Sequence, residues 1–171
     1  LGIDIEIPTH RVEECLSEVG IAFLFAPLMH QAMKFAIGPR REIGIRTIFN
    51  LLGPLTNPAG VSAQIMGVYA ADLTGMLARV LGNLGSTHAY VVHGMDGLDE
   101  ITITDRTKVS ELKGGEVNDY FIHPSDFDLP AGKPGDLKGG DAKVNASLTV
   151  DILNGEKGPK RDIVLLNAAA G

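Results

Sequence analysis

The chain has 171 residues, enough for a domain with a sizeable hydrophobic core. Hydrophobic residues make up 44% of the sequence, a composition typical of globular proteins and not of disordered ones. The net charge of −6 argues against a nucleic-acid partner, whose phosphates require a basic surface.

Cysteine content and hydropathy exclude further classes. The single cysteine, Cys15, rules out an internal disulfide and a zinc site built from several cysteines. The sequence has no secretory signal and no apolar run of transmembrane length. We therefore expect a soluble, cytoplasmic protein with no membrane partner.

The first third of the chain predicts helices around one strand. Residues 9–20 carry one apolar helical face, and residues 21–27 are apolar on both faces, as in a strand covered by helices on each side. Residues 28–38 predict a helix. Residues 39–60 predict short helical turns interrupted by glycine and proline.

The middle of the chain repeats a strand–helix–strand pattern. We expect a strand at 63–70, an amphipathic helix at 71–85 and a strand at 88–94. Units of this kind build parallel sheets through right-handed crossovers. Residues 107–123 then predict a polar hairpin that turns at the glycine pair 114–115.

The end of the chain predicts a helix from about residue 141 to Gly155, followed by a stretch, 165–171, that resembles the start of another helix. The elements together predict an α/β fold with a mostly parallel sheet flanked by helices, in a single domain over 1–171. The chain lacks an initiator methionine, so we expect both of its ends to be cuts through a longer polypeptide.

Two neighbouring carboxylates follow the predicted strand at 88–94. Asp99 and Glu100 come after a turn that contains Gly94 and Gly97, and their like charges repel at this distance. Solvent, a cationic side chain or a metal ion can offset that repulsion. Mg²⁺ commonly binds one or two carboxylates together with substrate phosphates. Capping of the next element in contact with water is the alternative interpretation.

Basic residues gather in the segment 39–60. Arg40, Arg41 and Arg46 lie among glycines and prolines, and arginine suits bidentate capture of a carboxylate or phosphate. Surface solvation and a salt bridge to Glu42 are equally compatible with the pattern. His30 follows the predicted strand at 21–27, where a binding role and a capping role are both open.

Three blocks of sequence carry a family resemblance. The central block is "FLFAPLMHQAMKFAIGPRREIGIRTIFNLLGPLTNPAG", and the later blocks are "HGMDGLDEIT" and "LKGGDAKVNASLTVDILNGEKGPKRDIVLLNAAAG". These blocks resemble the anthranilate phosphoribosyltransferases, a family of tryptophan biosynthesis. The resemblance extends over 1–171 and implies a nucleoside phosphorylase/phosphoribosyltransferase-type C-terminal domain that is truncated at both ends. One departure is Gln31, where the family commonly has proline, and it should alter the start of a helix more than the chemistry.

The resemblance also implies a reaction and its site residues. The family transfers the phosphoribosyl group of phosphoribosyl pyrophosphate (PRPP) to the amine of anthranilate and releases pyrophosphate. Asp99 and Glu100 match the acidic pair that binds Mg²⁺ with PRPP, and Arg40 matches the arginine that meets the anthranilate carboxylate. The positions that match the channel of the aromatic substrate are Ala26, His30, Gly53 and Pro54. No residue is matched to a catalytic acid or base.

Segments that the family has upstream are absent from these residues. The "GTGGD" loop that holds PRPP, the "KHGNR" segment and the helices that form the homodimer interface do not occur in the sequence. We therefore expect this chain alone to be inactive. The alternatives are an enzyme like the pyrimidine nucleoside phosphorylases, a nucleic-acid-binding relative of the family, and a folding fragment without activity.

Overall fold

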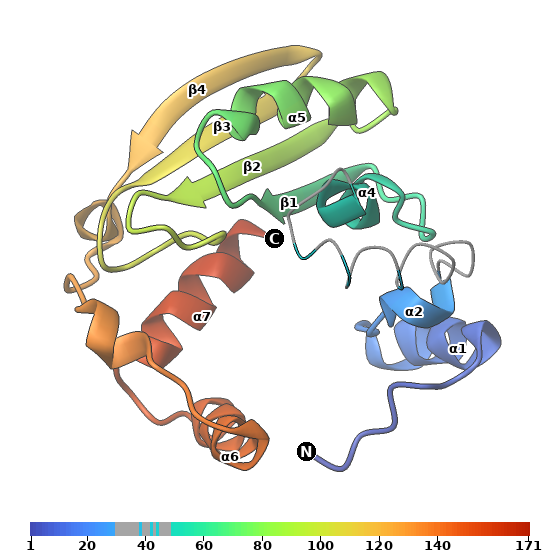
Figure 1. The fold of residues 1–171 in the computed structure, drawn as a ribbon, viewed down its shortest axis with the longest axis vertical. Coiled ribbons are helices and arrows are strands. Elements are labelled where there is room, and N and C mark those ends of the chain that lie inside the picture. The colour runs from blue at the N-terminus through green and yellow to red at the C-terminus, as the bar shows by residue number, and fades with distance from the viewer. Residues whose placement is uncertain (30–37, 39–41, 43, 45–48) are drawn as a thin grey trace. The chain divides into compact units, whose positions relative to one another are not determined.

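The computed structural model describes all residues except 30–37, 39–41, 43 and 45–48 (Figure 1). Contacts within the chain divide it into two compact units, Leu1–Ala59 and Gly60–Gly171, called unit 1 and unit 2 below. The predicted helix at 28–38 lies largely outside the described residues. The expectation of a single domain stays a prediction, and each unit is described by itself.

Unit 1 is helical in the part that the structure describes. Helix α1, Thr9–Val19, ends at Gly20, whose φ of 83° allows its N–H to donate to the Leu16 carbonyl. Helices α2, Ala26–Met29, and α4, Phe49–Leu55, follow.

The predicted strand at 21–27 is wrong. Residues 21–25 have no regular secondary structure, and α2 begins within the predicted range. Pro27 explains the difference, because its fixed φ and missing N–H suit the first turn of a helix. The Phe25 carbonyl accepts the N–H groups of Leu28 and Met29, which closes that turn.

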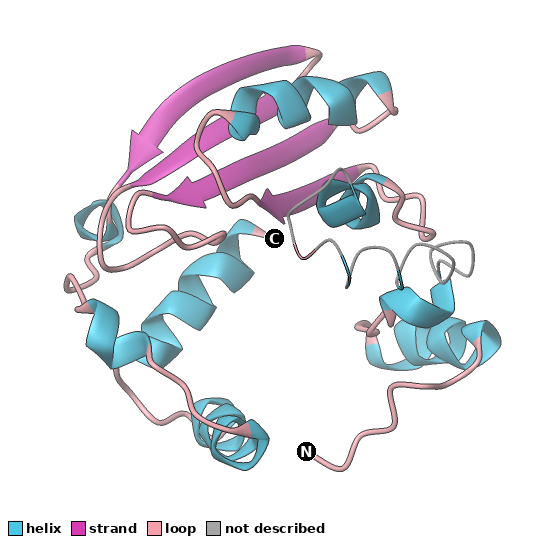
Figure 2. Cartoon of the chain, in the orientation of Figure 1, coloured by secondary structure: helices cyan, strands magenta, loops and turns pink. Residues whose placement is uncertain are grey.

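Unit 2 contains a four-stranded mixed sheet in the order β1-β2-β3-β4 (Figure 2). The strands are β1, Ala63–Gly67; β2, His88–Gly94; β3, Thr107–Lys113; and β4, Glu116–Ile122. β1 pairs parallel with β2, whereas the β2–β3 and β3–β4 pairs are antiparallel. The α/β class is confirmed, and the parallel pairing among the described strands is that of β1 with β2.

Helices cover both faces of this sheet. Helix α5, Leu73–Asn83, packs against β2, β3 and β4, and its buried Leu77 and Leu81 contribute to the core. Helix α7, Pro159–Ala170, contributes Ile163 and Leu166 to a separate cluster with Val92 of β2. The stretch 165–171 is therefore the end of a helix and not its start, so that expectation is wrong.

Turns and caps fix the remaining elements. The β3–β4 hairpin turns at Gly114 and Gly115, whose φ values of 60° and 85° are those of a tight two-residue turn. Helix α6, Ala142–Leu153, is capped at its amino end by Asp141, whose carboxylate accepts the Val144 N–H at 2.9 Å. Two short 3₁₀ helices precede α6, at Pro124–Phe127 and Pro134–Leu137.

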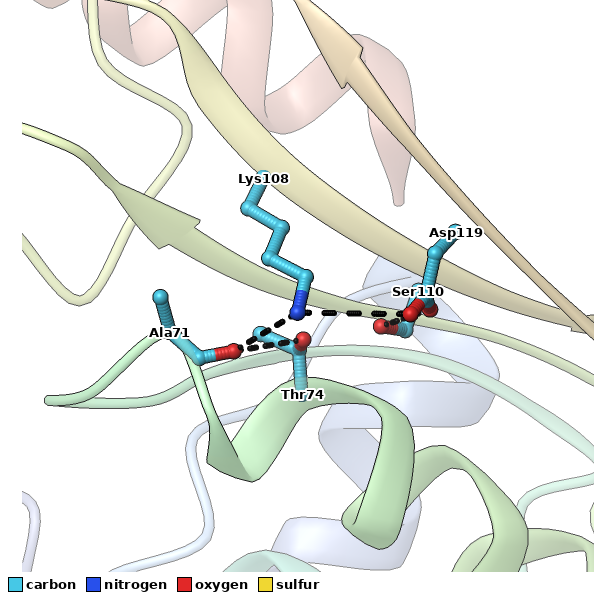
Figure 3. A network of polar contacts seen from close by, with 5 residues as sticks. All are labelled: Ala71, Thr74, Lys108, Ser110 and Asp119. Atoms are coloured by element: carbon cyan, nitrogen blue, oxygen red, sulfur yellow. Dashed lines mark hydrogen bonds and ion pairs between the residues drawn. The ribbon is translucent and has the colours of Figure 1, made fainter.

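A polar network attaches the start of α5 to the sheet (Figure 3). Lys108 on β3 donates through Nζ to the Ala71 carbonyl at 3.0 Å, and the Thr74 hydroxyl donates to the same carbonyl. Lys108 Nζ also lies 4.0 Å from the carboxylate of Asp119 on β4, which accepts the Ser110 hydroxyl. The amino end of α5 is thereby fixed against β3 and β4.

None of the described helices is both long enough and apolar enough to cross a lipid bilayer.

Candidate functional site

Asp99 and Glu100 lie in the loop that connects β2 to β3, and both are exposed. This loop folds over the end of β1: a Cβ atom on Gly67 would lie only 1.6 Å from the Asp99 carbonyl oxygen. The acidic pair is thus located at the carboxyl ends of the parallel strands β1 and β2. Open α/β sheets bind their ligands at this edge.

Asp96 organises the first half of the loop. Its carboxylate accepts hydrogen bonds from the Thr102 hydroxyl at 2.6 Å, from the Thr104 hydroxyl, and from the Leu98 N–H at 3.2 Å. Burial alone would raise the pKa of Asp96, but the hydrogen bonds from Thr102, Thr104 and Leu98 outweigh it, so the pKa lies below the ordinary carboxyl value. Asp96 is therefore ionised at neutral pH, and its carboxylate joins residues 98, 102 and 104 of the loop.

Asn167 on α7 holds the second half of the loop at Ile101, the residue after the acidic pair. The Asn167 side-chain oxygen accepts the Ile101 N–H at 3.0 Å, and the side-chain nitrogen donates to the Ile101 carbonyl at 2.8 Å. That nitrogen also donates to the Ile163 carbonyl of its own helix at 2.9 Å. The Ile101 side chain is buried in the cluster that contains Val92 and Leu166.

Sequence reasoning missed Asp96 and Asn167. Asp96 lies within the motif "HGMDGLDEIT", but its partners become visible only when the loop is folded. Asn167 is a single amide in the apolar stretch "IVLLNAAA", and a lone polar residue in such a stretch is the signal that could have identified it.

The acidic pair suits a hard cation. Within the described part of the chain, no lysine, arginine or histidine forms an ion pair with either carboxylate. The described residues also contain no group of three or more His, Cys, Asp or Glu side chains that could hold a metal. Two carboxylates supply only part of the oxygen shell of Mg²⁺, which ordinarily keeps water and phosphate ligands as well.

The other predicted site residues belong to unit 1. Ala26 is the exposed first residue of α2, and Gly53 and Pro54 lie within α4. His30 and Arg40 lie outside the described residues. Asp99 and Glu100 are neighbours in the sequence and share one exposed loop of unit 2. Their joint role in a site and the assembly of the aromatic-acid site stay predictions.

A pocket of about 550 Å³ opens on the sheet face that α7 partly covers. His88 and Tyr120 line it, and both contact the Glu111 carboxylate, His88 at 3.1 Å and the Tyr120 hydroxyl at 3.2 Å. Burial and the negative charge of Glu111 raise the pKa of Tyr120 to about 12. None of the predicted site residues that the structure describes lines this pocket, and the cleft beside the acidic pair stays a prediction.

Comparison with known proteins relates the whole chain to one family. Residues 1–171 match the model of a glycosyl transferase family, α/β domain. The anthranilate phosphoribosyltransferase of Moorella thermoacetica is 57% identical over 169 residues, which cover 99% of this chain and 50% of that protein. The protein of the same name from Geotalea daltonii is 56% identical over 171 residues and is covered to 49%. The chain spans about half the length of the curated relatives it matches.

Solved structures agree with these relatives. Anthranilate phosphoribosyltransferase from Thermus thermophilus has a TM-score of 0.92 at 42% identity, over 99% of this chain and 50% of that one. The Saccharomyces cerevisiae enzyme in complex with PRPP and Mg has a TM-score of 0.84 at 28% identity, over 96% and 48% of the two chains. The same yeast enzyme with 4-fluoroanthranilate has a TM-score of 0.87 at 28% identity, over 98% and 49%.

Proposed function

Because the chain belongs to the glycosyl transferase family whose α/β-domain model matches residues 1–171, we propose that it is part of an anthranilate phosphoribosyltransferase. The intact protein transfers the phosphoribosyl group from PRPP to the anthranilate amine and releases pyrophosphate, a step of tryptophan biosynthesis. Support comes from relatives of that name at 57% and 56% identity.

The observation that carries the proposal is the geometry of the acidic pair. Asp99 and Glu100 are exposed carboxylates without a cationic partner among the described residues, on a loop fixed at the carboxyl ends of β1 and β2. These two carboxylates would hold Mg²⁺ together with the pyrophosphate group of PRPP, and the bound ion would supply positive charge for the pyrophosphate leaving group. The complex of a yeast relative with PRPP and Mg supports this assignment.

The acceptor site is assigned to residues of unit 1. Anthranilate is a flat aromatic acid, so its site needs an apolar slot and a cation for the carboxylate. Arg40 binds that carboxylate, and the walls of the channel are formed by Ala26, His30, Gly53 and Pro54. The yeast relative in complex with 4-fluoroanthranilate supports this class of ligand.

The localisation and oligomeric state of the intact protein are also proposed from the family resemblance. We propose a cytoplasmic homodimer that forms through helices upstream of the segment matched here. No observation on this chain favours the alternative of an enzyme like the pyrimidine nucleoside phosphorylases. The net charge of −6 argues against the nucleic-acid-binding alternative, which a gel-shift assay with single-stranded DNA would test.

The test is a charge-neutral double variant of the full-length protein, Asp99→Asn with Glu100→Gln. We expect PRPP binding, followed by calorimetry across a Mg²⁺ titration, to lose its dependence on Mg²⁺, because neutral amides are poor ligands for this hard ion. Transfer, followed by anthranilate fluorescence, should fall with it.

The matched control is Glu116→Gln with Asp128→Asn, which removes two exposed negative charges elsewhere in unit 2. It should retain wild-type Mg²⁺ dependence. The proposal fails if the Asp99/Glu100 variant binds PRPP with the same Mg²⁺ dependence as the wild type.

A further inference from the structure

We infer that Asn167 is a positioning residue for the acidic pair, acting through the backbone of Ile101. This inference rests on the proposed function, since it concerns how Asp99 and Glu100 are presented to Mg²⁺ and PRPP. It concerns a residue on α7, a helix that supplies none of the proposed ligands.

The first step is that one side-chain amide bonds both polar backbone groups of a single residue. The Asn167 side chain bonds both the N–H and the carbonyl of Ile101, at 3.0 Å and 2.8 Å. The additional bond from the Asn167 nitrogen to the Ile163 carbonyl, at 2.9 Å, fixes which end of the amide donates. Asn167 therefore holds the Ile101 backbone at two points from a single rotamer.

The second step is that Ile101 is immobilised as a whole residue. Its side chain is only 4% exposed and packs with Val92, Val109 and Leu166. The backbone of Glu100 is covalently joined to this fixed residue. On the other side of the pair, the Asp99 carbonyl is packed against Gly67 at the end of β1. The backbone is therefore held on both sides of the acidic pair, while the carboxylates of Asp99 and Glu100 are exposed.

The third step concerns binding. A carboxylate on a fixed backbone loses less conformational freedom when it takes a metal ligand position than one on a mobile loop. Residues that orient metal ligands without touching the metal typically change metal affinity or activity by about 10–100-fold when they are replaced. Asn167 fits this description for Asp99 and Glu100.

The experiment compares Asn167→Ala and Asn167→Leu with the wild type in the full-length protein. Leucine keeps a side chain of similar size without the amide and adds no charge near the pair. The first measurement is hydrogen exchange of the loop 95–106, where we expect faster exchange of the Ile101 amide in both variants. The second is the Mg²⁺ concentration for half-maximal PRPP binding, which should rise about tenfold. Anthranilate affinity should stay at the wild-type value.

Two controls separate positioning from general destabilisation. Val164→Ala changes an exposed side chain on the same helix, and Leu81→Ala removes part of the core under α5. Neither should change the Mg²⁺ requirement. Unchanged exchange at Ile101, or faster exchange with an unchanged Mg²⁺ requirement, would overturn the inference. Absence of Mg²⁺-dependent PRPP binding in the wild type would instead refute the proposed function, and this inference with it.

Discussion

At the scale of single residues, Asp96 combines a structural role with a pH dependence. The hydrogen bonds from Thr102, Thr104 and Leu98 keep its folded-state pKa below the ordinary value of 3.8. A carboxyl group whose pKa is lower in the folded state than in the unfolded state stabilises the fold at pH values above its unfolded-state pKa. This contribution is lost as the pH falls through the folded-state pKa. The contribution of Asp96 is therefore present at pH 7 and lost below about pH 4.

We expect Asp96→Asn to lower the free energy of unfolding of unit 2 by about 1–3 kcal/mol at pH 7, because the amide NH₂ cannot accept from a hydroxyl. All three tyrosines, Tyr69, Tyr90 and Tyr120, lie in unit 2, so tyrosine fluorescence during urea unfolding reports this unit. The difference from the wild type should shrink at pH 3. A difference that is constant between pH 3 and pH 7 would contradict the role of the carboxylate.

A second prediction about a single residue concerns Arg40, whose role stays a prediction from the family resemblance. In the full-length protein, Arg40→Ala should raise the Michaelis constant for anthranilate more than that for PRPP. The loss of a charge-assisted bond to a carboxylate corresponds to about 1.5–3 kcal/mol. Arg46→Ala is the matched control and should leave the anthranilate constant nearly unchanged. Equal effects of both variants would refute the assignment.

At the scale of elements, the approach of the acidic loop to β1 depends on Gly67. Its backbone φ is not positive, so the requirement for glycine comes from the Asp99 carbonyl, which would lie 1.6 Å from a Cβ atom. A backbone atom cannot give way as a flexible side chain can. The end of β1 and the loop after β2 are therefore matched in shape.

Gly67→Ala should force the loop away from β1 and lower the free energy of unfolding of unit 2 by about 1–3 kcal/mol, as overpacking usually does. It should also weaken Mg²⁺-dependent PRPP binding in the full-length protein. The matched control is Gly135→Ala, because a Cβ at Gly135 meets open space. Equal stability of the two variants in tyrosine-detected urea unfolding would show that the loop adjusts without cost.

The elements differ in how well the sequence predicted them, for physical reasons. The strand at 88–94 was predicted with its observed bounds, and the hairpin was predicted because paired glycines at 114–115 permit positive φ. The strand at 21–27 was wrong, since a short apolar run fits a strand and a helix equally. The start of α7 was missed because "GPKRD" is polar and resembles a loop.

The candidate site residues also differ in how far the sequence indicates them. Asp99 and Glu100 are candidates from the sequence because adjacent acids after a strand form a local pattern, and their role in metal binding stays a prediction. The contact between Asn167 and Ile101 depends on how α7 packs on the sheet, and local periodicity carries no information about such packing.

At the scale of the whole molecule, activity requires both reactants to be held in line. Such orientation contributes at most roughly 7–11 kcal/mol to lowering the barrier. The residues 1–171 contain the acidic pair and the arginine segment, but not the "GTGGD" loop or the "KHGNR" segment of the family. We therefore expect these residues alone to position the substrates incompletely.

We predict that the purified 171-residue chain does not catalyse the transfer. The assay follows anthranilate fluorescence with PRPP and Mg²⁺, beside a full-length member of the family as the positive control. A rate for the chain comparable to that of the control would show that the substrate site has been assigned to the wrong residues.

The contact between Asn167 and Ile101 also has a consequence for the order of folding. It joins residues 66 positions apart, whereas the β3–β4 hairpin closes through its own turn. Local pairs form early, and contacts across long loops form late because of their closure entropy. On a ribosome, the acidic loop would stay unfastened until α7 had been synthesised. In pulse-labelled refolding, the Ile101 amide should gain protection after the amides of β3 and β4, so that the loop carrying the acidic pair is fixed only after the sheet has formed.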